Sequence, residues 1–439
     1  MTMKKIFSTL LAAALVSIAY GYEVKTSSTA GADGSVKCGE TVTLKLQALK
    51  DGKPITDDDL YLSISCHSDG ESGKHFKHPA NKEFVWSVTR KEPGRAYMVC
   101  RLKSRKDPKA EFRVKNPYNP SHRIGKHGIG FFADPDKQRI LRQEPADFDK
   151  FWDDRKAELA KIPLKVLEKV AVEPTSPEHK NFEIYDVKLS CVGPAPVSGI
   201  ITIPKDKSRK YPAIVRYHGA GVRSASVIAK PGGITFDINA HGLPNRKPLK
   251  FYDDIVKDPA RYPYRQTAEK RFEMFKFMFL RALRALEYVR TLPEWNGKDL
   301  IVYGGSQGGV QTLAAAALDK HVTLAVPSIP AMVGSAEFTI RNKVETAWPK
   351  PYADDFYRKK DITEIARKFD YVDGAFMMRR ISCPLHISVG LYDFHAAHVF
   401  AAFNHCTANK EKTLTGIPDM GHYAHNPIGY KAIEAILKK

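Results

Sequence analysis

The stretch Leu300-Ile-Val-Tyr-Gly-Gly-Ser-Gln-Gly-Gly309 decides the fold, because it predicts a buried strand that turns sharply into a helix. Its centre has the pattern Gly-x-Ser-x-Gly from Gly304 to Gly308, and an Ala-rich helix is expected to follow as far as Leu318. Glycine is needed at both ends of the pattern, since a Cβ there would collide with a neighbouring strand or helix. Such a turn strains the serine backbone and exposes its hydroxyl above a helix N-terminus. We therefore predict that Ser306 is a nucleophile.

Strand-like and helix-like segments alternate on both sides of this turn. The buried runs are 212–219, 322–327 and 384–390, and the long amphipathic segment is 274–292. Strand, helix and strand in repetition predict a mostly parallel sheet with helices on both faces. We place this α/β domain over residues 141–439.

The first part of the chain has a different pattern. Between residues 22 and 115, short runs alternate apolar and polar residues with Gly, Asp and Pro between them. This predicts antiparallel strands that form a small immunoglobulin-like β-sandwich, an accessory domain. Residues 116–140 are rich in turn residues and lack periodicity, so we expect a linker there. At 439 residues, the chain is long enough for two such domains.

The N-terminus has the features of an export signal. Lys4 and Lys5 precede an apolar run that ends near Ala19, where small residues suit a signal peptidase. Residues 1–21 are therefore expected to be a cleaved signal peptide, and the mature protein to be secreted or periplasmic. The sequence offers no segment with the roughly 20 apolar residues of a membrane helix, so no membrane span is expected.

Charge and cysteine content exclude some partners and cofactors. The formal net charge is +20, but Lys and Arg are scattered and no nucleic-acid-binding motif accompanies them, so no nucleic acid is expected. The six cysteines lack metal-ligand spacing, so no metal is expected. Cys66 and Cys100 each end a strand-like run, and either a disulfide between them or two buried free thiols fits the pattern.

A serine nucleophile needs a histidine base and a carboxylate that orients it. His422 follows Gly421 in the last loop of the expected sheet, and the glycine lets that loop come close to the serine. Asp393 comes just after the strand that ends at Gly390, at the edge where side chains point into the active-site crevice of such sheets. The weaker candidates are His425, His405, His398 and His395 for the base, and Asp370, Asp373 and Asp419 for the acid, which we interpret as cap or turn residues.

The negative charge that develops on the carbonyl oxygen needs two donors already in place. One is expected to be the backbone N–H of Gln307, which follows the serine. The other is expected from the loop Tyr217-His-Gly-Ala-Gly221, with Ala220 preferred and Gly219 or Gly221 as alternatives. No motif indicates which residues bind the substrate. The chemistry requires no cofactor.

In these motifs the second domain resembles the acetyl xylan esterase and cephalosporin C deacetylase family of α/β-hydrolases. The matching segments occur in the family's order over nearly 300 residues: 145–152, 217–219, 288–297, 304–309, 390–394, 399–404 and 421–422. The resemblance implies an α/β-hydrolase fold. It implies the triad Ser306, His422 and Asp393, and an oxyanion hole from Ala220 and Gln307.

The resemblance further implies an esterase that removes O-acetyl groups from a plant-type polysaccharide or oligosaccharide. The partner is then an acetylated carbohydrate, and a homo-oligomer is compatible with the family. This chain departs from the family pattern where Ala240-His-Gly-Leu243 replaces Arg-Gly-Gln, and where Tyr423 replaces a glutamate. The alternatives are a feruloyl or glucuronoyl esterase, another serine hydrolase, or a sugar-binding protein without turnover.

Overall fold

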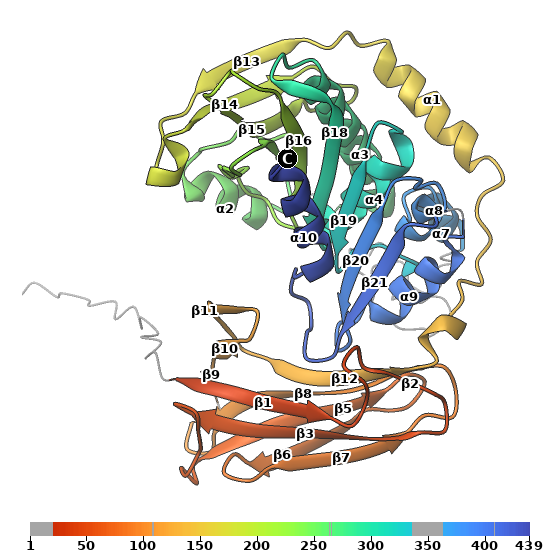
Figure 1. Ribbon diagram of the computed structural model, residues 1–439. Helices are drawn as coiled ribbons and strands as arrows, with labels where there is room; N and C mark the ends of the chain where they lie inside the picture. Colours follow the sequence, from red (N-terminus) through yellow and green to blue (C-terminus); the bar gives the residue numbers. More distant parts are fainter. Residues whose placement is uncertain (1–20, 108, 263, 265, 336–362, 408) are drawn as a thin grey trace, which may run out of the picture.

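The computed structural model describes residues 21–107, 109–262, 264, 266–335, 363–407 and 409–439. The predicted signal peptide lies outside these residues except for Gly21. Figure 1 shows two bodies, a front domain of strands (residues 22–133) and a second domain in which helices surround a large sheet (residues 141–439). Among the described helices, none is both long and apolar enough to cross a membrane.

The front domain consists of two sheets that share one apolar core. The first sheet contains β1 (Tyr22–Ser28), β3 (Thr41–Lys50), β4 (Lys53–Pro54) and β7 (Phe84–Thr89). The second has the order β2 (Ser35–Val36), β12 (His127–Ala133), β8 (Gly94–Ser104), β5 (Leu60–Ser68) and β6 (Lys74–Pro79), with β9 (Glu111–Phe112) beside β8. Along β3 the side chains at 42, 44, 46 and 48 are buried, as the alternation predicts.

The segment expected to be a linker, 116–140, is largely ordered as strands. It contains the hairpin of β10 (Val114–Asn116) and β11 (Asn119–Ile124), followed by β12. Strand β12 pairs with β8 along its whole length and with β2 at its end, so it lies inside the front sheet. All seven of its residues are buried, so the polar alternation that marks a half-exposed strand is missing. The linker interpretation is wrong for this strand.

All six cysteines are free thiols. Strands β5 and β8 are neighbours, yet Cys66 pairs with Met98 and Cys100 pairs with Ile64. In this register the two cysteines are displaced by two positions along the strands instead of lying opposite each other. No disulfide joins them. Burial raises the pKa of both thiols to about 12, so they remain protonated.

The second domain is built on a nine-stranded sheet. Its order is β13 (Val166–Ala171), β14 (Phe182–Leu189), β15 (Val197–Pro204), β17 (Ile234–Ile238), β16 (Tyr211–Tyr217), β18 (Trp295–Gly305), β19 (Leu324–Ser328), β20 (Leu385–Gly390) and β21 (Lys412–Ile417). The strands from β13 to β17 pair antiparallel and those from β17 to β21 pair parallel. This is the mixed sheet of an α/β-hydrolase.

Helices cover both faces of this sheet. They are α1 (Phe148–Ala160), α2 (Leu249–Lys257), α3 (Ala268–Arg290), α4 (Gln307–Leu318), α7 (Thr363–Asp370), α8 (Gly374–Met378), α9 (Ala396–His405) and α10 (Pro427–Leu437), with short 3₁₀ turns at Pro135–Lys137 and Pro177–His179. Strand β16 shows how the faces divide: Ala213 and Val215 join the core that contains α3 and α4, whereas Ile214 packs with Ile433 of α10. Because side chains alternate along a strand, a continuous apolar run serves both faces.

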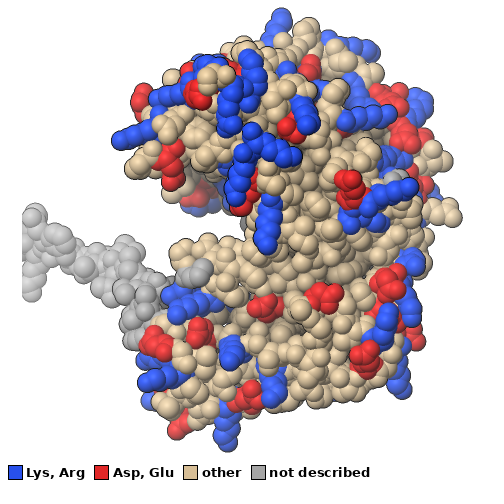
Figure 2. Space-filling model, viewed as in Figure 1, with Lys and Arg blue, Asp and Glu red and all other residues tan. Residues whose placement is uncertain are grey.

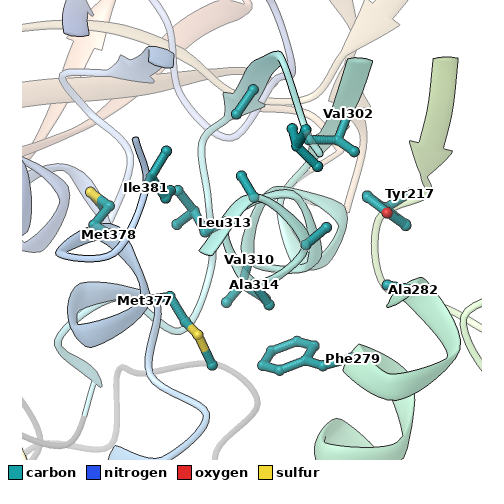
Figure 3. Packing of buried hydrophobic residues seen from close by; sticks show 14 of the residues in the cluster. Tyr217, Phe279, Ala282, Val302, Val310, Leu313, Ala314, Met377, Met378 and Ile381 are labelled. Atoms are coloured by element: carbon teal, nitrogen blue, oxygen red, sulfur yellow. The ribbon is translucent and has the colours of Figure 1, made fainter. Parts of the chain in front are cut away.

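Helix α4 lies inside this core, with most of its residues buried. Figure 3 shows Val310, Leu313 and Ala314 of α4 among Phe279 from α3 and Met377 from α8. These residues are all fully buried. The helix that follows the predicted nucleophile is therefore held on several sides, which fixes the position of its N-terminus.

Candidate active site

The loops that carry the predicted site residues meet at one edge of the sheet. Strands β16, β18, β20 and β21 are parallel, so their carboxyl ends lie at the same edge. The oxyanion loop follows β16, Ser306 follows β18, Asp393 follows β20 and His422 follows β21. Four segments that are far apart in the sequence are thereby brought together.

The turn at Ser306 is strained and closely packed. Ser306 has φ 57° and ψ −118°, a conformation that typically costs about 1–3 kcal/mol. A Cβ on Gly304 would lie 2.4 Å from the carbonyl oxygen of Tyr217, and one on Gly308 would lie 1.9 Å from the same oxygen. Glycine at both positions lets β16, the turn and helix α4 approach one another, as the sequence pattern predicts.

Ser306, His422 and Asp393 form one line of hydrogen bonds. His422 Nε2 lies 2.8 Å from Ser306 Oγ, and His422 Nδ1 lies 2.7 Å from Asp393 Oδ2. The other carboxylate oxygen of Asp393 accepts a bond of 3.0 Å from the backbone N–H of His395. This geometry suits a base that takes the serine proton and a carboxylate that orients the base. Their catalytic roles stay a prediction.

Asp393 is kept ionised in a buried position. The residue is 1% exposed, and burial on its own would raise its pKa. The hydrogen bond from His422, with the nearby His422 and His395 rings and the His395 N–H, outweighs this effect and holds the pKa of Asp393 below its usual value. The carboxylate is therefore available to fix the tautomer of His422.

The predicted oxyanion donors lie beside the serine. Gln307 is the first residue of α4, so its backbone N–H has no acceptor within the helix. The loop with Ala220 is close to the turn, since a Cβ on Gly219 would lie 3.4 Å from the Gly305 carbonyl and 3.9 Å from Ser306 Cβ. The arrangement is compatible with two N–H donors, and the choice of Ala220 stays a prediction.

A buried histidine, His218, holds the oxyanion loop. His218 Nδ1 lies 2.6 Å from the Gly219 carbonyl, to which it donates, and Nε2 accepts from the Ala240 N–H at 3.2 Å. Burial, with the charge of Arg223, lowers the pKa of His218 to about 4, so the ring is neutral. His218 thereby links the oxyanion loop to the backbone at Ala240.

Tyr264 and His241 complete the surroundings of Gln307, and sequence reasoning did not find this role. The Tyr264 hydroxyl donates to Gln307 Oε1 and lies 3.0 Å from His241 Nε2. A phenol has one proton, so His241 must be the donor in its bond with Tyr264. The Gly221 N–H also points at the Tyr264 oxygen, at 3.5 Å. His241 belongs to the segment that replaces the family's Arg-Gly-Gln. This departure from the family pattern was the only signal of its role in the sequence.

Comparison with known families decides the assignment. A model of the acetyl xylan esterase (AXE1) family matches residues 136–434, which is well over half of the chain. The chain belongs to this family. It is therefore a serine carboxylic-ester hydrolase and a carbohydrate esterase.

Individual relatives agree with the family. The acetyl esterase Axe7A of Xylanibacter ruminicola is 27% identical over 416 residues, which cover 87% of this chain and 91% of that protein. The solved acetyl xylan esterase from Paenibacillus sp. R4 is 26% identical with a TM-score of 0.55, covering 69% of this chain and 98% of that one. Acetyl xylan esterase 1 from Thermoanaerobacterium sp. JW/SL YS485 shares the fold, with a TM-score of 0.56, 22% identity and coverage of 69% and 97%.

The weaker candidates from the sequence have other partners. The rings of His425 and Tyr118 are 4.9 Å apart, and His405 Nε2 accepts from the Ile140 N–H at 3.1 Å. Asp373 accepts from the Ala375 N–H at 2.8 Å and so caps α8, as we expected. Asp370 pairs with Arg142, and Asp419 accepts from the hydroxyl of Tyr118.

Three residues near Ser306 are of the types that bind metal ions. Within the part of the chain that the structure describes, Asp393, His395 and His422 have potential ligand atoms within 4.8 Å of one another. Asp393 and His422 are hydrogen-bonded to each other, and the line of bonds continues to Ser306. We therefore interpret the cluster as a proton-transfer arrangement.

The close packing at Gly308 leads to a stability prediction. Gly308→Ala should lower the free energy of unfolding by about 1–3 kcal/mol, because its methyl group would overlap the Tyr217 carbonyl. Gly219→Ala is the matched control, since its Cβ would meet no atom closer than 3.4 Å. Thermal unfolding of both variants measures the difference. Equal unfolding temperatures would contradict the packing argument.

Proposed function

We propose that this protein is a secreted esterase that removes O-acetyl groups from a plant-type polysaccharide or oligosaccharide through a Ser-His-Asp triad. The observation that carries the proposal is the line of hydrogen bonds from Ser306 Oγ through His422 to Asp393, at the strained turn before α4. The family and the relatives named above support the choice of an acetylated carbohydrate. Export is supported by the sequence of residues 1–21 alone.

The reaction is a two-step acyl transfer. Ser306 Oγ attacks the ester carbonyl while His422 Nε2 takes its proton, and Asp393 stabilises the imidazolium that forms. The backbone N–H groups of Gln307 and Ala220 stabilise the negative oxygen of the tetrahedral intermediate. His422 then protonates the departing sugar hydroxyl. Water repeats the sequence on the acyl-enzyme and releases acetate.

The surface beside the triad suits a small apolar group and a sugar. Phe394 is 39% exposed, and its ring stacks on that of His422 with centroids 5.4 Å apart. On the face that Figure 2 shows, Lys and Arg are spread over both domains and interspersed with Asp and Glu. This distribution favours a neutral carbohydrate over nucleic acid as the partner. We also propose that the front β-sandwich is immunoglobulin-like.

The acyl group can be tested with a graded series of esters. We expect kcat/KM to fall by about 10-fold or more for each methylene added beyond acetate, because a pocket that fits two carbons rejects a longer chain. The measurement compares acetate, butyrate and feruloyl esters of the same alcohol, together with acetate release from acetylated xylan. Preference for the feruloyl ester with negligible acetate release would contradict the acetyl assignment and leave the triad untouched.

A further inference from the structure

The two loops that carry Asp393 and His422 rest on the front domain. The backbone N–H of Gly130 in β12 donates to the Pro418 carbonyl at 2.9 Å, four residues before His422. A Cβ on Gly130 would lie 3.2 Å from the carbonyl oxygen of Leu391, two residues before Asp393. In Figure 1 the loop after β21 reaches toward β12, which is the strand of the front domain on that side. The front domain is therefore packed against the active centre.

The register of the front sheet separates its two faces. Phe132 of β12 pairs with Arg95 of β8, and Gly130 pairs with Tyr97, so these four residues lie on one face. Phe132 packs in the core of the second domain, with its ring 4.7 Å from that of Phe400. Residues on the opposite face belong to the front domain's own core: Ala96, Met98, Ile129 and Phe131. One face of this sheet is thus built to contact the second domain.

Arg95 extends from this face to the catalytic acid. It is 3% exposed, and its Nη1 donates to the backbone carbonyl of Asp393. On the other side its Nε lies 3.2 Å from Asp69 Oδ1, and its own backbone N–H donates to Asp69 Oδ2 at 3.0 Å. The guanidinium also lies over the Tyr97 ring, 4.8 Å from its centroid. Arg95 is therefore fixed within the front domain before it contacts Asp393.

We propose that the front domain is a component of the active centre, in which Arg95 is a positioning residue that holds the Asp393 loop in place for His422. The inference rests on the triad proposed above. It changes the role of the front domain from an accessory module to a support for the catalytic acid. The family model matches residues 136–434, so the front domain that contains Arg95 lies outside the region that defines the family.

The physical reason is that Arg95 adds a restraint on the peptide of the catalytic acid, in addition to the backbone hydrogen bonds of the acid loop itself. Besides Arg95, the Asp393 carbonyl accepts a bond of 3.2 Å from the Ala396 N–H at the start of α9. A shift of this peptide would move Asp393 Oδ2 relative to His422 Nδ1, and misplacements of about 1 Å can cost 10²-fold in rate. The forked guanidinium can bond Asp69 and Asp393 simultaneously, whereas a lysine ammonium is a single point of charge on a flexible chain.

The test is made on the full chain with Arg95→Met and Arg95→Lys. Arg95→Met should lower kcat for a chromogenic acetate by about 10–100-fold while KM changes by less than about twofold, since the acid moves but the substrate contacts do not. The rate at which a fluorophosphonate labels Ser306 should fall by a similar factor, whatever acyl group the enzyme prefers. Arg95→Lys should lie between wild type and Arg95→Met. If Arg95→Met does not fold, Arg95→Lys alone decides, with a several-fold loss of kcat expected.

The matched control is Ser104→Ala, on the same strand β8. Ser104 is buried, and its hydroxyl donates to Asp59 at 2.6 Å, so the variant weakens the front domain away from the Asp393 loop. It should retain the wild-type kcat and labelling rate. Unchanged rates in both Arg95 variants would overturn the proposal, as would an equal loss in Ser104→Ala. Absence of Ser306 labelling in the wild type would overturn the triad and the positioning role with it, whereas failure on acetate alone would overturn only the acyl assignment.

Discussion

Replacing Ser306 by alanine is expected to lower kcat for a chromogenic acetate by about 10⁶-fold while the protein still folds. The proton acceptor His422 Nε2 lies 2.8 Å from the Ser306 hydroxyl, and no acyl-enzyme can form without that oxygen. The backbone donors near Gln307 remain, so a small residual rate above that in water is expected. Steady-state kinetics gives kcat, and loss of fluorophosphonate labelling identifies the missing nucleophile.

The control for this variant is Ser190→Ala. Its hydroxyl donates to the Pro163 carbonyl at 2.6 Å, just after β14, which is separated by three strands from β18 and the turn at Ser306. This variant should keep wild-type kcat, which separates loss of the nucleophile from loss of a serine in the same domain. If Ser306→Ala retained a tenth of the wild-type kcat, another residue would be the nucleophile.

The second domain could be predicted from sequence because its signals are local. A strand, a Gly-x-Ser-x-Gly turn and a helix follow one another from Leu300 to Leu318, and the structure has them as the end of β18 and as α4. The parallel pairing then follows from the alternation of strands with helices, since such connections place the carboxyl ends at one edge. The positions of Asp393 and His422 after their strands follow from the same rule.

The front domain was harder to predict where its residues contact the second domain. Strand β12 is buried throughout, and its two glycines resemble the turn residues of a linker. Those residues suit close approach: Gly130 leaves room for the Leu391 carbonyl, and Phe132 fills the core of the second domain. A contact between two domains has no periodicity of its own in the sequence.

The supporting residues of the site were missed for a related reason. Arg95 occupies a strand that alternates like any other, and its bond to Asp393 joins residues 298 positions apart. Tyr264 and His241 belong to no motif, and their relation to Gln307 appears only once the loops are folded. Candidate catalytic residues can be predicted from local sequence patterns. The residues that position them are recognised only from tertiary contacts.

Replacing Asp393 by asparagine is expected to lower kcat by about 10⁴-fold at neutral pH with little change in fold. One carboxylate oxygen accepts from the His395 N–H at 3.0 Å, so the amide oxygen of asparagine should take that place. The amide NH₂ would then face His422 Nδ1, which must become the acceptor of this bond. The ring proton would consequently sit on Nε2, and His422 could no longer take the proton of Ser306.

The measurement is kcat on the same chromogenic acetate, with Asp299→Asn as the matched control. Asp299 accepts a bond of 2.8 Å from Asn296 at the start of β18, away from the triad, so its variant should keep wild-type kcat. Asp393→Asn should also lose the strongly deshielded proton resonance expected for an Nδ1–H that donates to a carboxylate. Retention of that resonance together with at least a tenth of wild-type kcat would show that Asp393 does not set the tautomer of His422, because an amide NH₂ cannot accept this hydrogen bond as the carboxylate does.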